Sequence, residues 1–134
     1  MTVKNKIILT VLLLIDISTM FLSWFGGARG IKEISGTIVL LNPITILCIV
    51  LFVVGLWYPF KKDRNWISLV AILGIIGVKI YEFIFWHYMT MTGKVSLSLS
   101  LQLTYPEFYF SLAVSFIILF LYSFMKIKKT GKLI

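Results

Sequence analysis

Residues 66–88 read WISLVAILGIIGVKIYEFIFWHY, an apolar stretch in which only Lys79 and Glu82 carry a charge at neutral pH. A helix of about 20 apolar residues is long enough to cross the hydrocarbon core of a membrane. Three further apolar runs lie at residues 7–25, 43–60 and 106–125. The sequence therefore predicts an all-α membrane protein, a four-helix transmembrane bundle that forms a single integral membrane domain over residues 1–134. Residues 26–42 and 89–105 form its outer segments.

The composition excludes a soluble globular protein. Of the 134 residues, 60% are hydrophobic and 13% are charged, and the mean hydropathy is +1.01. Soluble domains have about 45–50% apolar and about 25% charged residues. The first run also has features of a signal peptide, because Lys4 and Lys6 precede it and small residues follow at 26–28. We expect an uncleaved span, since the run is long for a signal peptide and Asp16 interrupts it.

The cations are distributed unevenly between the two predicted sides. Loops rich in Lys and Arg stay in the cytoplasm. One side has only three loop cations, whereas the other has nine, so we expect a multi-pass protein of the cell membrane with both termini cytoplasmic. The basic tail from Lys126 to Lys129 can bind anionic lipids, although general surface attraction explains it equally well. The outer cations are Arg29, Lys32 and Lys94, and the inner ones are Lys4, Lys6, Lys61, Lys62, Arg64, Lys126, Lys128, Lys129 and Lys132.

Residues 95–104, VSLSLSLQLT, alternate apolar and polar side chains. Alternation with a period of two is typical of a β-strand, which needs a partner strand for its backbone. Residues 30–41 contain β-branched side chains that suit such a partner. We expect a small extracellular antiparallel β-sheet, which either covers the helix ends or offers an edge to another protein. The apolar face of this outer interaction strand consists of Val95, Leu97, Leu99, Leu101 and Leu103.

This layout resembles the claudin-like plan of four spans, cytoplasmic termini and an outer sheet. The resemblance covers the topology of the whole chain. The claudin signature in the first outer loop is absent, because residues 55–57 (Gly-Leu-Trp) lie at the inner end of the second span and Cys48 is the only cysteine. The resemblance therefore implies a topology and no junctional role. The segments 23–25, 34–36 and 42–44 also look like those of small bacterial four-span proteins of unassigned function.

Three ionisable residues lie within the predicted spans, namely Asp16, Lys79 and Glu82. Charges inside a membrane are costly and often functional. Counted from the inner boundary, Asp16 and Lys79 reach similar depths near the midplane, and Glu82 follows Lys79 at i+3 on the same helix face. We expect a charge cluster of two acids around one base. It can transfer protons or ions, recognise a polar ligand, or fix the helices.

Other polar and small residues have simpler interpretations. His87 and Glu107 are expected at the outer interface, where they can titrate or form part of a metal site, although one histidine favours a polar ring. Cys48 is expected in the core. Small residues in the third and fourth spans allow close helix packing, namely Ala71, Gly74, Gly77, Ser111 and Ser115.

We expect a non-catalytic polytopic membrane protein that acts by partner binding, such as an accessory subunit or an immunity-type protein of a bacterial envelope. The alternative is a small oligomeric proton-coupled transporter or channel that uses Asp16, Lys79 and Glu82. The sequence contains no phosphate loop and no Ser-His-Asp arrangement, so neither an enzyme nor a cofactor or metal is expected. The expected partners are the lipid bilayer and a protein or a second copy of the chain, and not nucleic acid.

Overall fold

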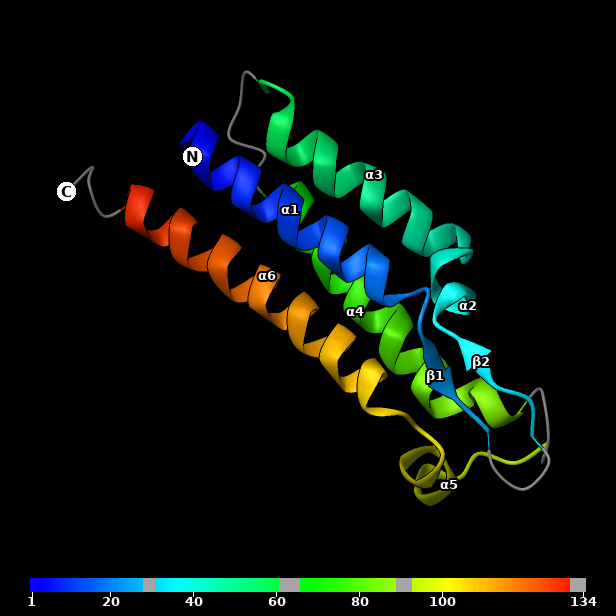
Figure 1. The fold of residues 1–134 in the computed structure, drawn as a ribbon. Coiled ribbons are helices and arrows are strands. Elements are labelled where there is room, and N and C mark those ends of the chain that lie inside the picture. Colours follow the sequence, from blue (N-terminus) through cyan, green and yellow to red (C-terminus); the bar gives the residue numbers. More distant parts are fainter. Residues whose placement is uncertain (28–30, 61–65, 89–92, 131–134) are drawn as a thin grey trace.

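The computed structural model describes residues 1–27, 31–60, 66–88 and 93–130, with the side chains of 128–130 excepted. Four long helices make up most of the molecule (Figure 1), and consecutive long helices run in opposite directions, so the two chain ends lie at the same end of the bundle. Several cations used to predict the topology lie outside the described residues, namely Arg29, Lys61, Lys62, Arg64 and Lys132. The four helices are α1 (Val3–Thr19), α3 (Pro43–Trp57), α4 (Trp66–His87) and α6 (Pro106–Thr130).

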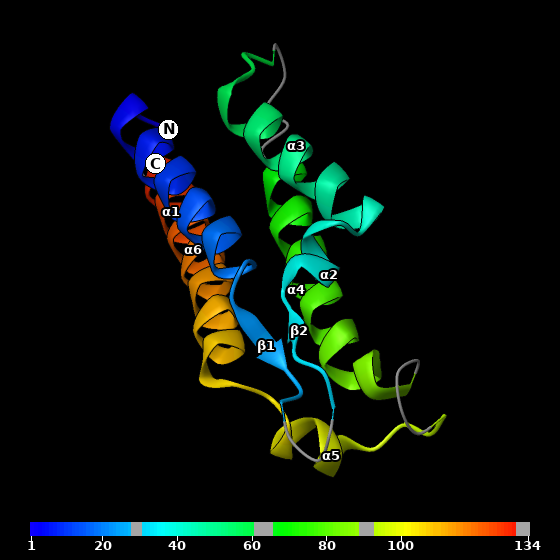
Figure 2. The ribbon, with the colours of Figure 1, turned by 45° about the vertical axis from the view of Figure 1, so that its right-hand side comes forward.

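The four helices associate as two pairs. Helix α1 packs along α6 and α3 packs along α4, as Figure 2 shows from the side. Helix α4 also contacts α6 and thereby links the two pairs. The short elements β1 (Ser23–Phe25), β2 (Ile34–Ser35), α2 (Thr37–Leu40) and α5 (Leu97–Gln102) lie toward the end of the bundle opposite the termini.

In the part of the chain that the structure describes, two helices are long and apolar enough to cross a membrane, namely α4 and residues Pro106–Ile127 of α6. Helices α1, with 17 residues, and α3, with 15, are shorter than the predicted spans at 7–25 and 43–60. Tyr58 ends α3 because it precedes Pro59, which disfavours helical backbone at that residue. Helix α1 ends at Thr19, where the indole nitrogen of Trp24 donates a 3.0 Å hydrogen bond to the Thr19 carbonyl. That bond satisfies a carbonyl that has no partner within the helix.

The sheet is smaller than predicted, and its two strands are not the predicted pair. Strand β1 pairs with β2 in antiparallel orientation, with Ser23 opposite Ser35. On the other side of β1, the Trp24 carbonyl accepts a hydrogen bond from the Tyr105 amide, and Gly26, which follows β1, donates to the Leu103 carbonyl. Phe25 and Thr104 form an isolated antiparallel bridge. The sequence assigned residues 23–25 to the first span. They leave the helix because they supply the backbone partners for both flanking segments.

The predicted strand at residues 95–104 is wrong, because Leu97–Gln102 form helix α5. Ser96 caps this helix by accepting a hydrogen bond from the Leu99 amide. The helix buries Ser100 and is followed by the buried Leu103, whereas Leu97 and Leu101 remain exposed. Strand β1 has three residues, so it can pair only with the end of this segment. Residues 37–40, also expected in a strand, form helix α2.

Aromatic side chains hold the short elements onto the helices. Phe25 of β1 stacks on Trp86 of α4 with ring centroids 5.2 Å apart. Trp24 of β1 packs edge-on against Phe108 of α6 at 5.3 Å, and Phe108 stacks on Phe83 of α4. These rings connect β1 to α4 and α6, so the end of the bundle opposite the termini has a continuous aromatic core.

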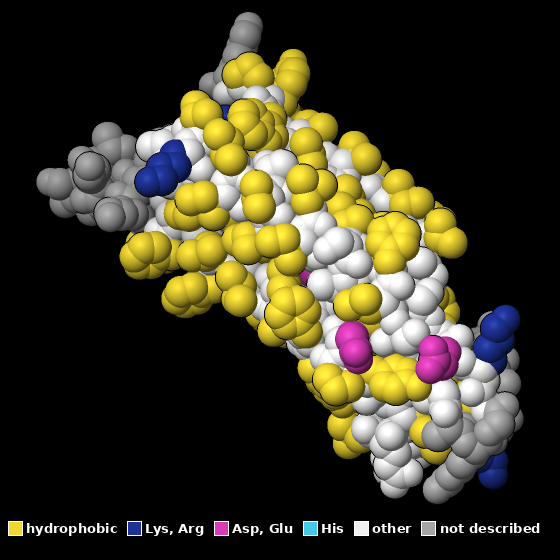
Figure 3. All heavy atoms as spheres, in the orientation of Figure 1, with side chains coloured by type: hydrophobic (Ala, Val, Ile, Leu, Met, Phe, Trp, Pro, Cys, Tyr) yellow, Lys and Arg dark blue, Asp and Glu magenta, His cyan; other side chains and the backbone are white. Residues whose placement is uncertain are grey.

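The outside of the helices is unusually apolar. Figure 3 shows hydrophobic side chains spread along the length of the bundle, whereas the lysines visible on that face lie at its two ends. Large residues of all four helices are exposed, including Leu14 of α1, Val50 of α3, Leu73 of α4 and Phe120 of α6. In water such a continuous apolar surface is unfavourable, and in a membrane it contacts lipid.

Candidate functional site

The ionisable residues of α1 and α4 form a buried ion pair. The Lys79 ammonium lies 2.6 Å from Asp16 Oδ1, and both side chains have no exposed surface. Asp16 lies within the last turn of α1, where the helix dipole is unfavourable for an acid. The Lys79 cation compensates both this dipole and the cost of burying the carboxylate.

Two serines of α6 complete the coordination of the pair. Ser111 and Ser115 lie one turn apart, so both face the same side of α6. Lys79 Nζ lies 2.8 Å from the Ser111 hydroxyl, 3.1 Å from the Ser111 carbonyl and 2.7 Å from the Ser115 hydroxyl. Ser115 in turn donates to the Asp16 carboxylate at 3.0 and 3.1 Å. Since an ammonium has three protons, these acceptors and Asp16 satisfy Lys79 fully.

Thr19 and Trp24 close the cluster on its remaining sides. The Thr19 hydroxyl lies 2.5 Å from the Asp16 carbonyl and 2.6 Å from the Ser111 hydroxyl. The Lys79 ammonium lies 5.8 Å from the centre of the Trp24 ring, within the range of a cation–π interaction. Residues of α1, β1, α4 and α6 therefore surround one ammonium group. We call the set Asp16, Thr19, Lys79, Ser111 and Ser115 the polar cluster.

The polar cluster lies nearer to one end of the bundle than predicted. Asp16 is within one turn of the end of α1, and Lys79 lies about two turns before the end of α4. These are the helix ends next to the sheet. The sequence placed the two residues near the midplane because the first span was expected to continue to residue 25. Because α1 ends at Thr19 and residues 20–25 are not helical, Asp16 lies closer to the sheet end than predicted.

The third predicted member of the charge cluster, Glu82, is not part of this arrangement. Its side chain is half-buried on α4 and makes no salt bridge with any residue that the structure describes. The donors of Lys79 are directed to α1 and α6 instead. The structure thus brings together Asp16 and Lys79 and leaves Glu82 outside their coordination.

The predicted outer-interface residues His87 and Glu107 form no hydrogen bond or ion pair with each other. His87 is fully buried, and its Nε2 lies 2.9 Å from the Ser100 hydroxyl of α5. Glu107 is exposed in the first turn of α6. Within the described ranges, no three His, Cys, Asp or Glu residues are placed to hold a metal ion. Cys48 is buried in α3, where a Cβ on Gly74 of α4 would lie 2.5 Å from its sulfur.

Four neighbours of the ion pair have a role that the sequence does not predict. The sequence predicts close helix packing for Ser111 and Ser115, and a place within the first span for Thr19 and Trp24. Two hydroxyls one turn apart in an apolar run are a signal for a polar partner on another helix. Trp24 carries no comparable signal, because its position depends on the turn that follows α1.

A scan against family models, a search of curated proteins and a search of solved structures found no match to this chain. The polar cluster is closed, fully hydrogen-bonded and shared by three helices, which suits a structural link between the two helix pairs.

Proposed function

We propose that the chain is a non-catalytic, four-span protein of the cell membrane, with both termini cytoplasmic, that acts by binding a partner protein. An accessory subunit or an immunity-type protein of a bacterial envelope fits this description. The exposed apolar surface along all four helices supports the membrane location. Helices α1 and α3 are short for a span, and the flanking residues 20–22 and 58–60 extend each apolar segment toward the required length.

The observation that carries the partner-binding proposal is an apolar ridge on α5. Leu97 and Leu101 lie one turn apart with 57% and 56% of their surface exposed, and Val95 precedes them with a similar exposure. Helix α5 lies across the end of the bundle that carries the sheet (Figure 2). Exposed apolar side chains one turn apart are suited to pack against a helix of another protein. We therefore assign the ridge to an apolar helix of a partner membrane protein.

The state of the polar cluster favours this function over a proton-coupled transporter. A relay requires Asp16 or Lys79 to exchange protons with water. Both side chains have no exposed surface, and their hydrogen-bonding groups are occupied by α1, α4 and α6. The ion pair therefore suits helix fixation. Flux measurements in liposomes test the alternative, since proton or ion flux abolished by Asp16→Asn would establish it in place of partner binding.

Purification from native membranes in mild detergent tests the partner-binding proposal. The variant Leu97→Gln/Leu101→Gln is expected to lose a partner that copurifies with the unchanged chain. The control Leu97→Met/Leu101→Met keeps the apolar area and is expected to retain it. Partner recovery that is the same with both double variants contradicts binding through the ridge, as does repeated recovery of the chain alone.

A further inference from the structure

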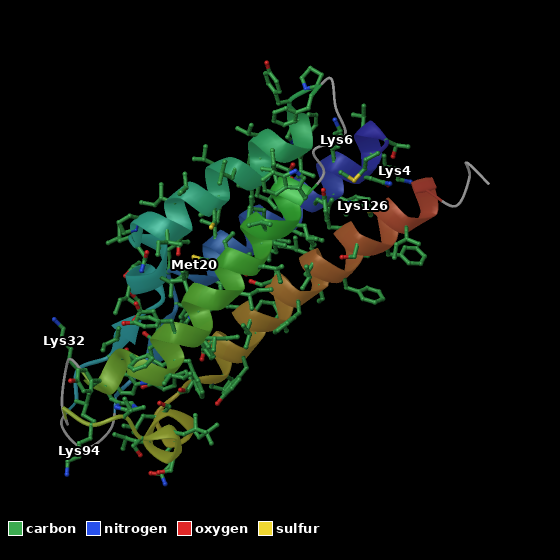
Figure 4. The ribbon with its side chains drawn as sticks, turned by 180° about the vertical axis from the view of Figure 1, so that it is seen from behind. Lys4, Lys6, Met20, Lys32, Lys94 and Lys126 are labelled. Atoms are coloured by element: carbon green, nitrogen blue, oxygen red, sulfur yellow. The ribbon has the colours of Figure 1, made fainter. Side chains whose placement is uncertain are left out.

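Three lysines from two helices lie at the end of the bundle that carries the termini. Figure 4 shows Lys4 and Lys6 of α1 and Lys126 of α6 at that end, and Lys32 and Lys94 at the opposite end. The acids that the structure describes all lie in the half with the sheet, and Asp63 lies outside the described residues. Those described acids are Asp16, Glu33, Glu82 and Glu107. Of the residues whose side chains the structure describes, the terminal end therefore carries these lysines and no acid.

One of these lysines is held in place by an aromatic ring. The Lys6 ammonium lies 5.7 Å from the centre of the Trp57 ring at the end of α3. Trp57 is fixed in turn, because its indole nitrogen donates a 3.0 Å hydrogen bond to the Thr10 hydroxyl of α1. Thr10 also donates to the Lys6 carbonyl at 2.8 Å. Lys6 is thus preorganised, which lowers the entropy cost of binding an anion.

An apolar stripe begins beside the same lysines. Val3, Ile7, Val11 and Leu14 recur along α1 at helical spacing, and all four are about half exposed or more. The stripe runs from the cationic end toward the middle of the bundle. A cationic group followed by an apolar stripe of this kind matches a phospholipid, whose phosphate lies at the membrane surface and whose acyl chains extend into the core.

We propose that Lys4, Lys6 and Lys126, with Trp57, form a site for the phosphate of an anionic phospholipid whose acyl chain lies along the α1 stripe. The inference rests on the membrane location proposed above and is independent of the α5 ridge. Each lysine near a membrane surface contributes about 1 kcal/mol to binding an anionic lipid, or roughly fivefold in affinity. Loss of both α1 lysines should therefore weaken binding about 30-fold.

The experiment compares two variants of the full chain with the same change in net charge. Lys4→Gln/Lys6→Gln removes two cations from the site, and Lys32→Gln/Lys94→Gln removes two from the opposite end. Retention of phosphatidylglycerol and of phosphatidylcholine with identical acyl chains is measured by native mass spectrometry of the detergent-solubilised protein. We expect the unchanged chain and the Lys32/Lys94 variant to prefer the anionic lipid, and the Lys4/Lys6 variant to lose that preference about 30-fold.

Three outcomes overturn the proposal. Equal loss in both variants assigns the preference to the net charge, and equal retention assigns it to other residues. Displacement of the lipid by inorganic phosphate at about millimolar concentration, which corresponds to weak binding, shows that the site binds an anion without recognising the acyl chain. Alkaline extraction of membranes tests separately whether the chain is an integral membrane protein at all. A chain released by alkali is not integral, whereas a retained chain without lipid preference lacks only the site.

Discussion

Lys79 of α4 donates a 2.6 Å hydrogen bond to Asp16 of α1, and neither side chain has any exposed surface. Breaking a buried ion pair on one side leaves an uncompensated charge and costs about 3–5 kcal/mol. We expect Lys79→Met to lower the free energy of unfolding by about this amount. The double variant Asp16→Leu/Lys79→Met is expected to cost less than the sum of the two single changes, as measured by unfolding titrations in detergent.

The control for this cycle is Glu82→Gln, a change on the same helix outside the coordination of Lys79. A substitution without such partners usually changes stability by less than about 0.5 kcal/mol. Single changes whose effects add within experimental error in the double variant would contradict a direct Asp16–Lys79 interaction.

The close approach of Gly36 to Trp24 predicts a second effect on stability. A Cβ on Gly36 would clash with the Trp24 ring, so Gly36→Ala must displace the indole from its position over the Lys79 ammonium. Overpacking of this kind costs about 1–3 kcal/mol. In α4, a Cβ on Gly77 would meet no described atom within 4 Å, so Gly77→Ala should be neutral or stabilise the helix by up to about 1 kcal/mol. The two variants are compared by thermal unfolding and Trp fluorescence. An equal loss of stability in both would contradict the close packing of Gly36 against Trp24.

The hydrogen bond between His87 and Ser100 predicts how α5 is attached to α4. Ser100→Ala leaves the buried His87 Nε2 without its described partner, which costs about 1–3 kcal/mol. We expect faster hydrogen exchange of the α5 amides in this variant. Ser98→Ala, at an exposed position of the same helix, is the matched control. If exchange accelerates equally in both variants, the attachment of α5 does not depend on His87.

The contact between Tyr105 and Glu33 predicts a pH dependence in the alkaline range. The Tyr105 hydroxyl donates a 3.1 Å hydrogen bond to Glu33 Oε1, and this bond raises the pKa of Tyr105 above its ordinary value of 10.0. Its stabilising effect is fully present below the ordinary pKa and is lost as the pH rises through the raised value. Glu33→Gln should return the pKa of Tyr105 toward the ordinary value. The pKa of Tyr105 is measured by ultraviolet titration of its phenol, and the Tyr105→Phe variant identifies which part of the absorbance change comes from this residue.

Glu107→Gln serves as the control for this titration. The charge of Glu107 raises the pKa of Tyr105 less than the hydrogen bond to Glu33 does. The Glu107 variant should therefore move the Tyr105 titration by less. A larger effect at Glu107 than at Glu33 would show that the hydrogen bond is not the main cause.

The proposed topology predicts the accessibility of cysteines placed at the two ends of the bundle. In a Cys48→Ala background, Lys94→Cys should react with a membrane-impermeant thiol reagent on intact cells. Lys4→Cys should react only after the membrane is permeabilised, because the excess of cations places the termini in the cytoplasm. The opposite pattern of labelling would invert the proposed orientation.

Local signals in the sequence account for the helical part of the fold. Asn42 and Pro43 mark the start of α3, and the Asn42 side chain accepts a hydrogen bond from the Ile44 amide. Pro106 and Glu107 likewise open α6, where an acid is favourable at the helix N-terminus. Apolar length and capping residues act within a few positions along the chain, so they can be interpreted without knowledge of distant contacts.

The segment at residues 95–104 shows where local periodicity misleads. Its alternation predicts a strand, but a strand requires a partner of similar length, and β1 offers three residues. The same sequence also places Leu97 and Leu101 on one side of a short helix and directs Ser100 to His87. Because the pattern fits both conformations, the available partners select between them.

The polar cluster has a similar origin. The sequence alone predicts that Asp16 pairs with Lys79, because burying either charge in a membrane is costly without an opposite charge nearby. The exclusion of Glu82, the hydroxyls of Ser111 and Ser115 and the cover provided by Trp24 depend on how α1, α4 and α6 pack and on the turn after Thr19. Hydrogen bonds act over about 3 Å. Partners that are 32 to 99 residues apart in the chain are therefore selected by the packing of the helices and not by any local pattern.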